Sequence, residues 1–193
     1  MRMPDGKRKR LPPEERKQQL LESALELFCE KGVDGTTMHQ LAHHAGVSYG
    51  LFYHYFTSKD EVLQTAVRQT TVLPLIEEFL SHHQQSARTL LMKLPSFYLE
   101  VMETRREIVW LLFTESKKRP GLAEKLSELA VDFRKTLSDY LQARAAHGEI
   151  REGDDLDVAT RLIWSYLFMR FLWIEDEPDA EQHMAIILDG LCS

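Results

Sequence analysis

The sequence predicts an all-α protein in which a three-helix segment at residues 14–57, here called the head, precedes a larger helical body. Apolar residues recur three and four positions apart along most of the chain, which is the spacing of an amphipathic helix. Side chains that cap helices precede several of these stretches, and glycine or proline follows them. No two alternating stretches flank a tight turn, so no β-hairpin is expected. We expect about nine helices in total.

The first helix is predicted to begin at Pro12 and Pro13, because proline fits the first turn of a helix. Glu14 and Glu15 follow, where acidic side chains suit the positive end of the helix dipole. The apolar stripe of this helix, at positions i, i+3, i+4 and i+7, consists of Leu21, Ala24, Leu25 and Phe28. Gly32 is expected to end the helix.

Two short helices joined by a tight turn follow. Thr37–Gln40 is a capping box, which opens the second helix of the chain. Residues 45–47 form the turn, in which Gly46 can take a positive φ. Ser48 then caps a third helix that reaches about Tyr55. This arrangement is typical of a helix-turn-helix, whose second helix enters the major groove of DNA.

The third helix has residues that suit contact with DNA bases. Leu51 and Phe52 are expected to pack inward on the first two helices. The polar side chains left on the outer face are Ser48, Tyr49, Tyr53 and His54. An exposed glycine inside a helix costs about 1 kcal/mol relative to alanine. Gly50 is explained if it lets the helix approach the bases closely, and we expect Ser48, Tyr49 and Gly50 to read them.

A fourth helix is expected to connect the head to the body over residues 58–74. Ser58–Glu61 is a second capping box, and the helix should run to about Thr71, with Pro74 ending or kinking it. The body then occupies residues 75–193.

Phosphate contacts are predicted on both sides of the third helix. Lys59 lies in the first turn of the fourth helix, where a cation opposes the helix dipole. The free amides of a helix N-terminus next to a lysine form a good phosphate site. We therefore expect Lys59 and Tyr53 to hold one DNA strand, and Thr36 and Thr37 to hold the other.

Charge is divided unevenly along the 193 residues. The net charge is −6, yet residues 1–61 hold nine basic and nine acidic side chains, so the net negative charge lies entirely in the rest of the chain. The first 17 residues have a net charge of +4 and include the basic run Lys7–Arg10. The arm at residues 1–13 is either a solvated tail or a segment that reaches phosphates or the minor groove.

The run from Thr37 to Leu63 resembles the DNA-binding signature of the TetR/AcrR family of transcriptional regulators. The matching residues are Thr37, Leu41, Ala42, Ala45, Gly46, Val47, Ser48, Gly50, Leu51, Phe52, Tyr53, Tyr55, Phe56, Lys59 and Leu63. With the first helix, the likeness covers about the first third of the chain, and the body is similar only in layout. The resemblance implies an Ω-shaped homodimer that dimerises through its last two helices and holds an effector in its body.

The body is predicted to consist of longer helices. Their expected ranges are 86–104, 106–117, 122–147, 156–174 and 179–191. Pro95 should kink the first of them, and further proline and glycine residues separate the others.

Bulky side chains of the body are candidates for an effector pocket. The residues proposed to contact the ligand are Phe97, Tyr98, Val101, Trp110, Phe113, Phe133, Trp164, Phe168 and Arg170. For any one aromatic residue, the alternative is a place in the core or the dimer interface. As a set they predict a pocket for an apolar or amphipathic effector. Arg170 needs a carboxylate partner in either subunit, or else it recognises an anionic group of the ligand.

Other patterns point to no further chemistry. Cys29 and Cys192 fit neither a disulfide nor a metal site, so a cytoplasmic location is expected, with Cys29 in or near the core. His39 and His43 have a spacing that can hold zinc, but no third ligand is evident, so no metal and no cofactor are predicted. The longest apolar stretch is too short to span a bilayer, and no catalytic motif of an enzyme is recognisable.

The sequence therefore predicts a ligand-responsive regulator that binds double-stranded DNA. The favoured hypothesis is a repressor that leaves a palindromic operator when a small lipophilic effector binds its body. A transcriptional activator, or a regulator of the same fold that needs no ligand, is the alternative.

Overall fold

The computed structural model describes residues 11–82, 84–151, 153, 155–172 and 180–189. The helices in these residues are α1 (Pro13–Lys31), α2 (Met38–His44), α3 (Tyr49–Tyr55), α4 (Lys59–Gln69), α5 (Leu73–Leu80), α6 (Ala87–Glu103), α7 (Arg106–Ser116), α8 (Pro120–Ala146), α9 (Asp155–Leu172) and α10 (Ala180–Asp189). The all-α prediction is confirmed. The basic run Lys7–Arg10 lies outside the described residues.

The predicted helix starts are confirmed by their caps. At the N-termini of α2, α3, α4 and α6, the capping side chains are Thr37, Ser48, Ser58 and Ser86. The side chain of Gln40 accepts the backbone N–H of Thr37 at 2.8 Å, which completes the predicted capping box. Gly32 follows α1 with φ of 74°, and Gly46 turns the chain between α2 and α3 with φ of 67°.

Helix α5 is not predicted by the sequence analysis. Helix α4 ends at Gln69, and Pro74 lies in the first turn of α5. Proline is well suited to that position because its missing N–H has no partner in the first turn of a helix. Pro74 therefore starts a helix here and does not end the preceding one.

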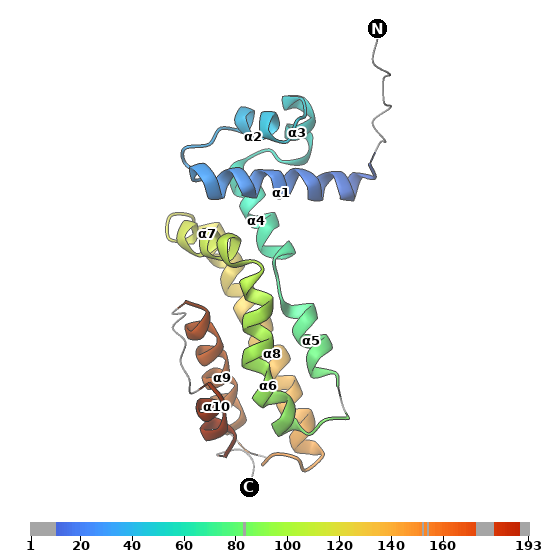
Figure 1. Cartoon of the computed structure of the whole chain (residues 1–193), viewed down its shortest axis with the longest axis vertical. Helices are drawn as coiled ribbons and strands as arrows, with labels where there is room; N and C mark the ends of the chain where they lie inside the picture. The colour runs from blue at the N-terminus through green and yellow to red at the C-terminus, as the bar shows by residue number, and fades with distance from the viewer. Residues whose placement is uncertain (1–10, 83, 152, 154, 173–179, 190–193) are drawn as a thin grey trace.

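Head and body share an apolar core at their junction. Helices α1–α3 form one end of an elongated molecule, with α7 beneath α1 and the long helices α6 and α8 extending away from it (Figure 1). The apolar cluster of the head includes Phe28 and Phe52, but also Leu112 from α7 and Leu122 from α8. A second cluster fills the body between α5, α6, α8, α9 and α10. The two parts are thus packed together and are not joined by α4 alone.

Two predictions about burial are wrong. Phe52 is fully buried as expected, but Leu51 is 38% exposed, because neighbouring residues on a helix point about 100° apart. Cys29 is exposed near the end of α1, in a surface hollow beside α7. In the described part of the chain, no helix is both long enough and apolar enough to cross a membrane.

The orientation of α3 can be tested with two neighbouring substitutions. Phe52→Ala should lower the free energy of unfolding by about 3–5 kcal/mol, because it removes a fully buried ring. Leu51→Ala should lower it by less than about 1 kcal/mol, because its side chain is largely solvated. Urea unfolding followed by circular dichroism measures both, and equal losses for the two variants would contradict the orientation.

Candidate nucleic-acid interface and apolar pocket

Helix α3 presents a polar face at the end of the molecule farthest from α9 and α10 (Figure 1). Its exposed polar side chains, with that of its cap, are Ser48, Tyr49, Tyr53 and His54. A Cβ atom added to Gly50 would meet no atom within 4 Å, so packing within the chain does not require glycine there. The face is therefore open to a partner, and glycine makes it locally flat.

An aromatic stack extends this face onto α2. The rings of His39 and Tyr49 lie 4.1 Å apart and are nearly parallel, and Tyr53 lies 5.8 Å from Tyr49. The stack restricts the rotamers of Tyr49, one of the predicted base-reading residues. The sequence analysis considered His39 only as a metal ligand, and its place beside Tyr49 depends on how α2 packs on α3.

The predicted phosphate contacts have different surroundings in the structure. Thr36 is 1% exposed and its hydroxyl donates to the carbonyl of Gly32 at 2.8 Å, so its side chain cannot reach a phosphate and that prediction is corrected. Thr37 is exposed. The ammonium group of Lys59 donates to the carbonyls of Val33 and Thr36 at 2.7 and 2.9 Å. Lys59 therefore ties the start of α4 to the loop after α1, and its phosphate contact stays a prediction.

The body contains an apolar pocket with a volume of about 380 Å³. It is lined by Thr70, Thr71, Val72, Leu73, Tyr98, Met102, Val109, Leu112, Phe113, Ser116, Ala123, Leu126, Ser127, Leu129, Ala130, Phe133, Trp164, Phe168, Phe171 and Leu172. None of these described lining residues is charged, and the polar side chains among them are hydroxyls and an indole. Burial raises the pKa of Tyr98 above its usual value, so its hydroxyl is neutral at pH 7.

Five of the nine predicted ligand contacts line this pocket. They form a chain of touching rings in the order Tyr98, Phe133, Trp164, Phe168 and Phe113. Successive ring centres are between 4.8 and 6.0 Å apart. The chain gives one wall of the pocket a continuous aromatic surface, which suits a flat or apolar ligand.

The other four predicted contacts lie outside the lining. Phe97 stacks on Phe79 at 4.4 Å, Val101 packs against the core of the body, and Trp110 is 49% exposed beside α1. Arg170 is absent from the lining as well, and its guanidinium carbon lies 5.9 Å from the ring centre of Tyr166.

One sequence signal could have separated these two groups. On α7 the lining residues are Val109, Leu112, Phe113 and Ser116. They follow the i, i+3, i+4, i+7 spacing of one helix face, whereas Trp110 falls on another face. The spacing identifies a face, but only the packed structure shows that this face borders a cavity.

The pocket also touches the end of α4. Residues 70–73, which join α4 to α5, form part of its lining. Arg105 donates to the carbonyls of Thr70 and Thr71 at 3.5 and 3.3 Å, which holds this junction against the start of α7. A ligand in the pocket therefore contacts the segment that connects the body to the head.

The bracing role of Lys59 gives a stability prediction. Lys59→Met should lower the free energy of unfolding by about 1–3 kcal/mol, because two carbonyls lose a charged donor. Lys135→Met, which removes an exposed ion pair with Asp139 on α8, should have little effect. Urea unfolding at equal protein concentration measures both. An unchanged free energy of unfolding in Lys59→Met would mean that the two hydrogen bonds do not brace the loop.

Comparisons with known proteins find a family match near the N-terminal end of the chain. Residues 20–66 match the bacterial regulatory proteins of the tetR family. The chain is 26% identical to the HTH-type transcriptional repressor KstR2 of Mycolicibacterium smegmatis. The alignment is 193 positions long and covers 93% of this chain and 92% of that protein.

Two solved structures share the fold. A TetR-family regulator from Mesorhizobium loti has a TM-score of 0.76 at 17% identity, covering 95% of this chain and 100% of that chain. The ketosteroid transcriptional regulator KstR2 of Mycobacterium tuberculosis has a TM-score of 0.62 at 24% identity, covering 92% and 95%. Residues 20–66 thus match the tetR family of bacterial regulatory proteins, and the all-α fold of the chain is similar to that of a TetR-family regulator.

Proposed function

We propose that the chain is a homodimeric repressor that binds a palindromic operator through α3 and leaves it when a small apolar effector enters the body. The observation that carries this proposal is the placement of the pocket. Its lining includes the α4–α5 junction, and α4 packs at its other end into the head that presents α3. One helix thus connects a ligand-sized cavity to a DNA-reading face.

The exposed face of α3 supports binding in a major groove. Tyrosine, serine and histidine side chains can contact bases and phosphates, and Gly50 leaves room for close approach. The net negative charge lies beyond residue 61, away from this face. The phosphate contacts of Thr37, Tyr53 and Lys59 belong to this proposal.

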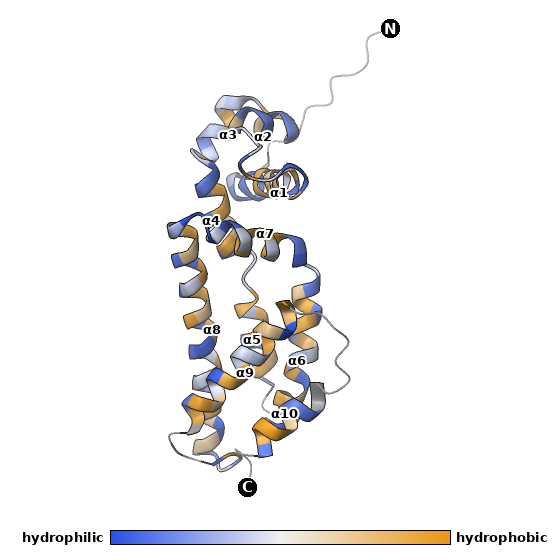
Figure 2. Cartoon of the chain, turned by 90° about the vertical axis from the view of Figure 1, so that its left-hand side faces the viewer, coloured by the Kyte–Doolittle hydropathy of each residue, from blue (hydrophilic) through white to orange (hydrophobic). Residues whose placement is uncertain are grey.

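Exposed apolar residues on α9 support a dimer. One face of α9 packs into the body through Ile163, Leu167 and Phe171. The exposed large apolar residues on the rest of α9 are Val158, Leu162 and Met169. Ile186 on α10 is exposed as well, and Figure 2 shows hydrophobic residues on both helices. Large apolar side chains that stay exposed on a helix whose other face is already buried are typical of an interface, so a second copy is the proposed partner.

The pocket favours an uncharged effector. Its volume of about 380 Å³ lies near the lower end of the range for small-molecule sites. An ionised group would be buried there without a partner of opposite charge among the lining residues, which is costly. Since one relative is described as a ketosteroid regulator, a steroid ketone is a suitable first compound to test.

Selection of DNA from a random duplex library tests the proposed function. The purified full chain should enrich a sequence with two symmetric half-sites about one helical turn apart. Binding should weaken steeply with salt, and a steroid ketone should release the duplex. Failure to enrich any sequence would contradict DNA reading by α3, whereas enrichment without release by any apolar compound would contradict ligand control.

Gly50→Ala should separate stability from DNA binding. The free energy of unfolding should stay equal or rise by up to about 1 kcal/mol, because alanine favours a helix and its Cβ meets no atom. Affinity for the selected duplex should fall at least about tenfold, because the added methyl group intrudes between helix and bases. Gln142→Ala, exposed on α8, should change neither quantity. If Gly50→Ala binds the selected duplex as tightly as the parent, this part of α3 does not lie in the DNA interface.

Leu162→Glu should convert the dimer to a monomer, because it places a carboxylate at the proposed two-fold interface. Sedimentation velocity measures the mass in solution. Val131→Glu changes an exposed apolar residue of α8 and should leave the dimer intact. A monomeric parent chain, or a dimeric Leu162→Glu variant, would contradict α9 as the dimer face.

A further inference from the structure

Helix α7 lies between the pocket and the head. Val109, Phe113 and Ser116 line the pocket. Leu112 lines it too, and also belongs to the apolar cluster of the head, while Ile108 and Leu111 pack against that cluster. A change in the volume of the pocket therefore acts on side chains that also support α1.

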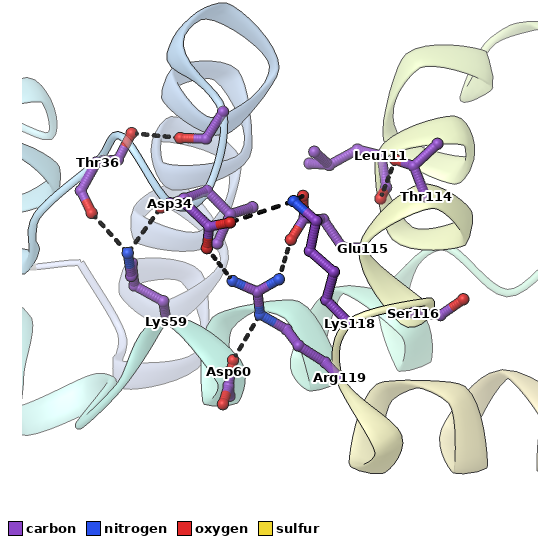
Figure 3. A network of polar contacts seen from close by, with 12 residues as sticks. Asp34, Thr36, Lys59, Asp60, Leu111, Thr114, Glu115, Ser116, Lys118 and Arg119 are labelled. Atoms are coloured by element: carbon purple, nitrogen blue, oxygen red, sulfur yellow. Dashed lines mark hydrogen bonds and ion pairs between the residues drawn. The ribbon is translucent and has the colours of Figure 1, made fainter.

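A cluster of charged residues joins the end of α7 to the head (Figure 3). Arg119, which immediately precedes α8, donates to Asp34 at 2.6 Å and to Asp60 at 3.0 Å, and it also bonds Glu115. Asp34 lies in the loop after α1, and Asp60 lies in the first turn of α4. Lys118 bonds Asp34 at 3.2 Å. One guanidinium group thus contacts the loop after α1, the first turn of α4 and the last turn of α7.

The geometry of this cluster makes it sensitive to small movements. The side chain of Arg119 is only 16% exposed, whereas its partners Asp34 and Asp60 are 64% and 63% exposed, so the ion pairs lie at the edge of the solvent and the buried guanidinium group fixes their position. Its planar guanidinium group bonds three carboxylates in fixed directions. The hydrogen bonds from Arg119, and then from Lys118, lower the pKa of Asp34, so this carboxyl stays ionised at neutral pH.

The two ends of α4 are held from the two ends of α7. Arg105 precedes α7 and bonds the carbonyls that follow α4, whereas Arg119 follows α7 and bonds Asp60 at the start of α4. The first turn of α8 is close to α4 as well, since a Cβ atom added to Gly121 would lie 3.2 Å from the side-chain nitrogen Nε2 of Gln64. A shift of α7 must therefore move α4 or break one of these contacts.

We propose that Arg119 is a positioning residue for the head, through which occupancy of the pocket changes the placement of α3. An effector displaces the pocket face of α7, the turn at residues 117–119 follows, and the bonds from Arg119 to Asp34 and Asp60 shift the loop after α1 and the start of α4. This inference rests on the proposed ligand control of DNA binding and identifies its route.

The coupling between pocket and DNA can be measured with Nile red, an uncharged apolar dye. Its dissociation constant is determined for the full chain alone and with a saturating amount of the selected duplex. In the parent chain the duplex should weaken dye binding at least about fivefold. The coupling ratio is the dissociation constant of the dye with DNA divided by that without DNA. In Arg119→Gln this ratio should fall below two. The dissociation constant without DNA should stay within twofold of the parent, because Arg119 does not line the pocket.

Matched variants separate coupling from general damage. Arg119→Lys should keep an intermediate ratio, since an ammonium group cannot reproduce the planar arrangement of bonds. Arg88→Gln removes another ion pair between helices, from α6 to Asp189 of α10, and should keep the parent ratio. A parent ratio in Arg119→Gln would overturn the proposal.

Hydrogen exchange tests the contact without any ligand. In Arg119→Gln, backbone amides of residues 33–36 and 59–61 should exchange at least about fivefold faster than in the parent, and in Arg88→Gln they should not. Unchanged exchange in Arg119→Gln would overturn the proposal. If the parent shows no coupling to Nile red, ligand control by such compounds fails, and the exchange rates alone decide whether Arg119 positions the head.

Discussion

The shared apolar cluster at the junction of α1, α4, α7 and α8 is the constraint on which the rest of the structure depends. A three-helix head of this size buries only a limited apolar surface by itself. Leu112 and Leu122 from the body complete that burial. The face of α3 that we propose reads DNA is therefore held in place by the same helices that form the pocket. Any ligand that moves α7 changes the support of the head.

Local signals in the sequence were sufficient for most of the fold. Helix caps at Thr37, Ser48 and Ser58 and turns at glycine depend on neighbouring residues only, so they are readable from the chain. Helix α5 was missed because proline is compatible with both the end and the start of a helix. The exposure of Leu51 and the burial of Thr36 depend on how α3 and the loop after α1 pack, which neighbouring residues do not determine.

The candidate sites were predictable in kind and only partly in detail. The motif in α2–α3 identifies a reading face, but the stack of His39 on Tyr49 joins two helices whose packing the motif does not specify. Bulky residues of the body indicate an apolar pocket, and five of the nine predicted contacts line it. The contacts of Arg119 with Asp34 and Asp60 join residues 85 and 59 positions apart, so no local pattern could reveal them.

The uncharged lining of the pocket has a consequence for what the cell can detect. A compound that binds there gives up its contacts with water and gains no ionic partner from the lining, so neutral molecules are favoured over ions. The same property lets a molecule dissolve in the hydrocarbon interior of a bilayer. For an effector of the proposed kind, entry by passive diffusion needs no dedicated importer, and the supply of that effector depends on its partition between membrane and water.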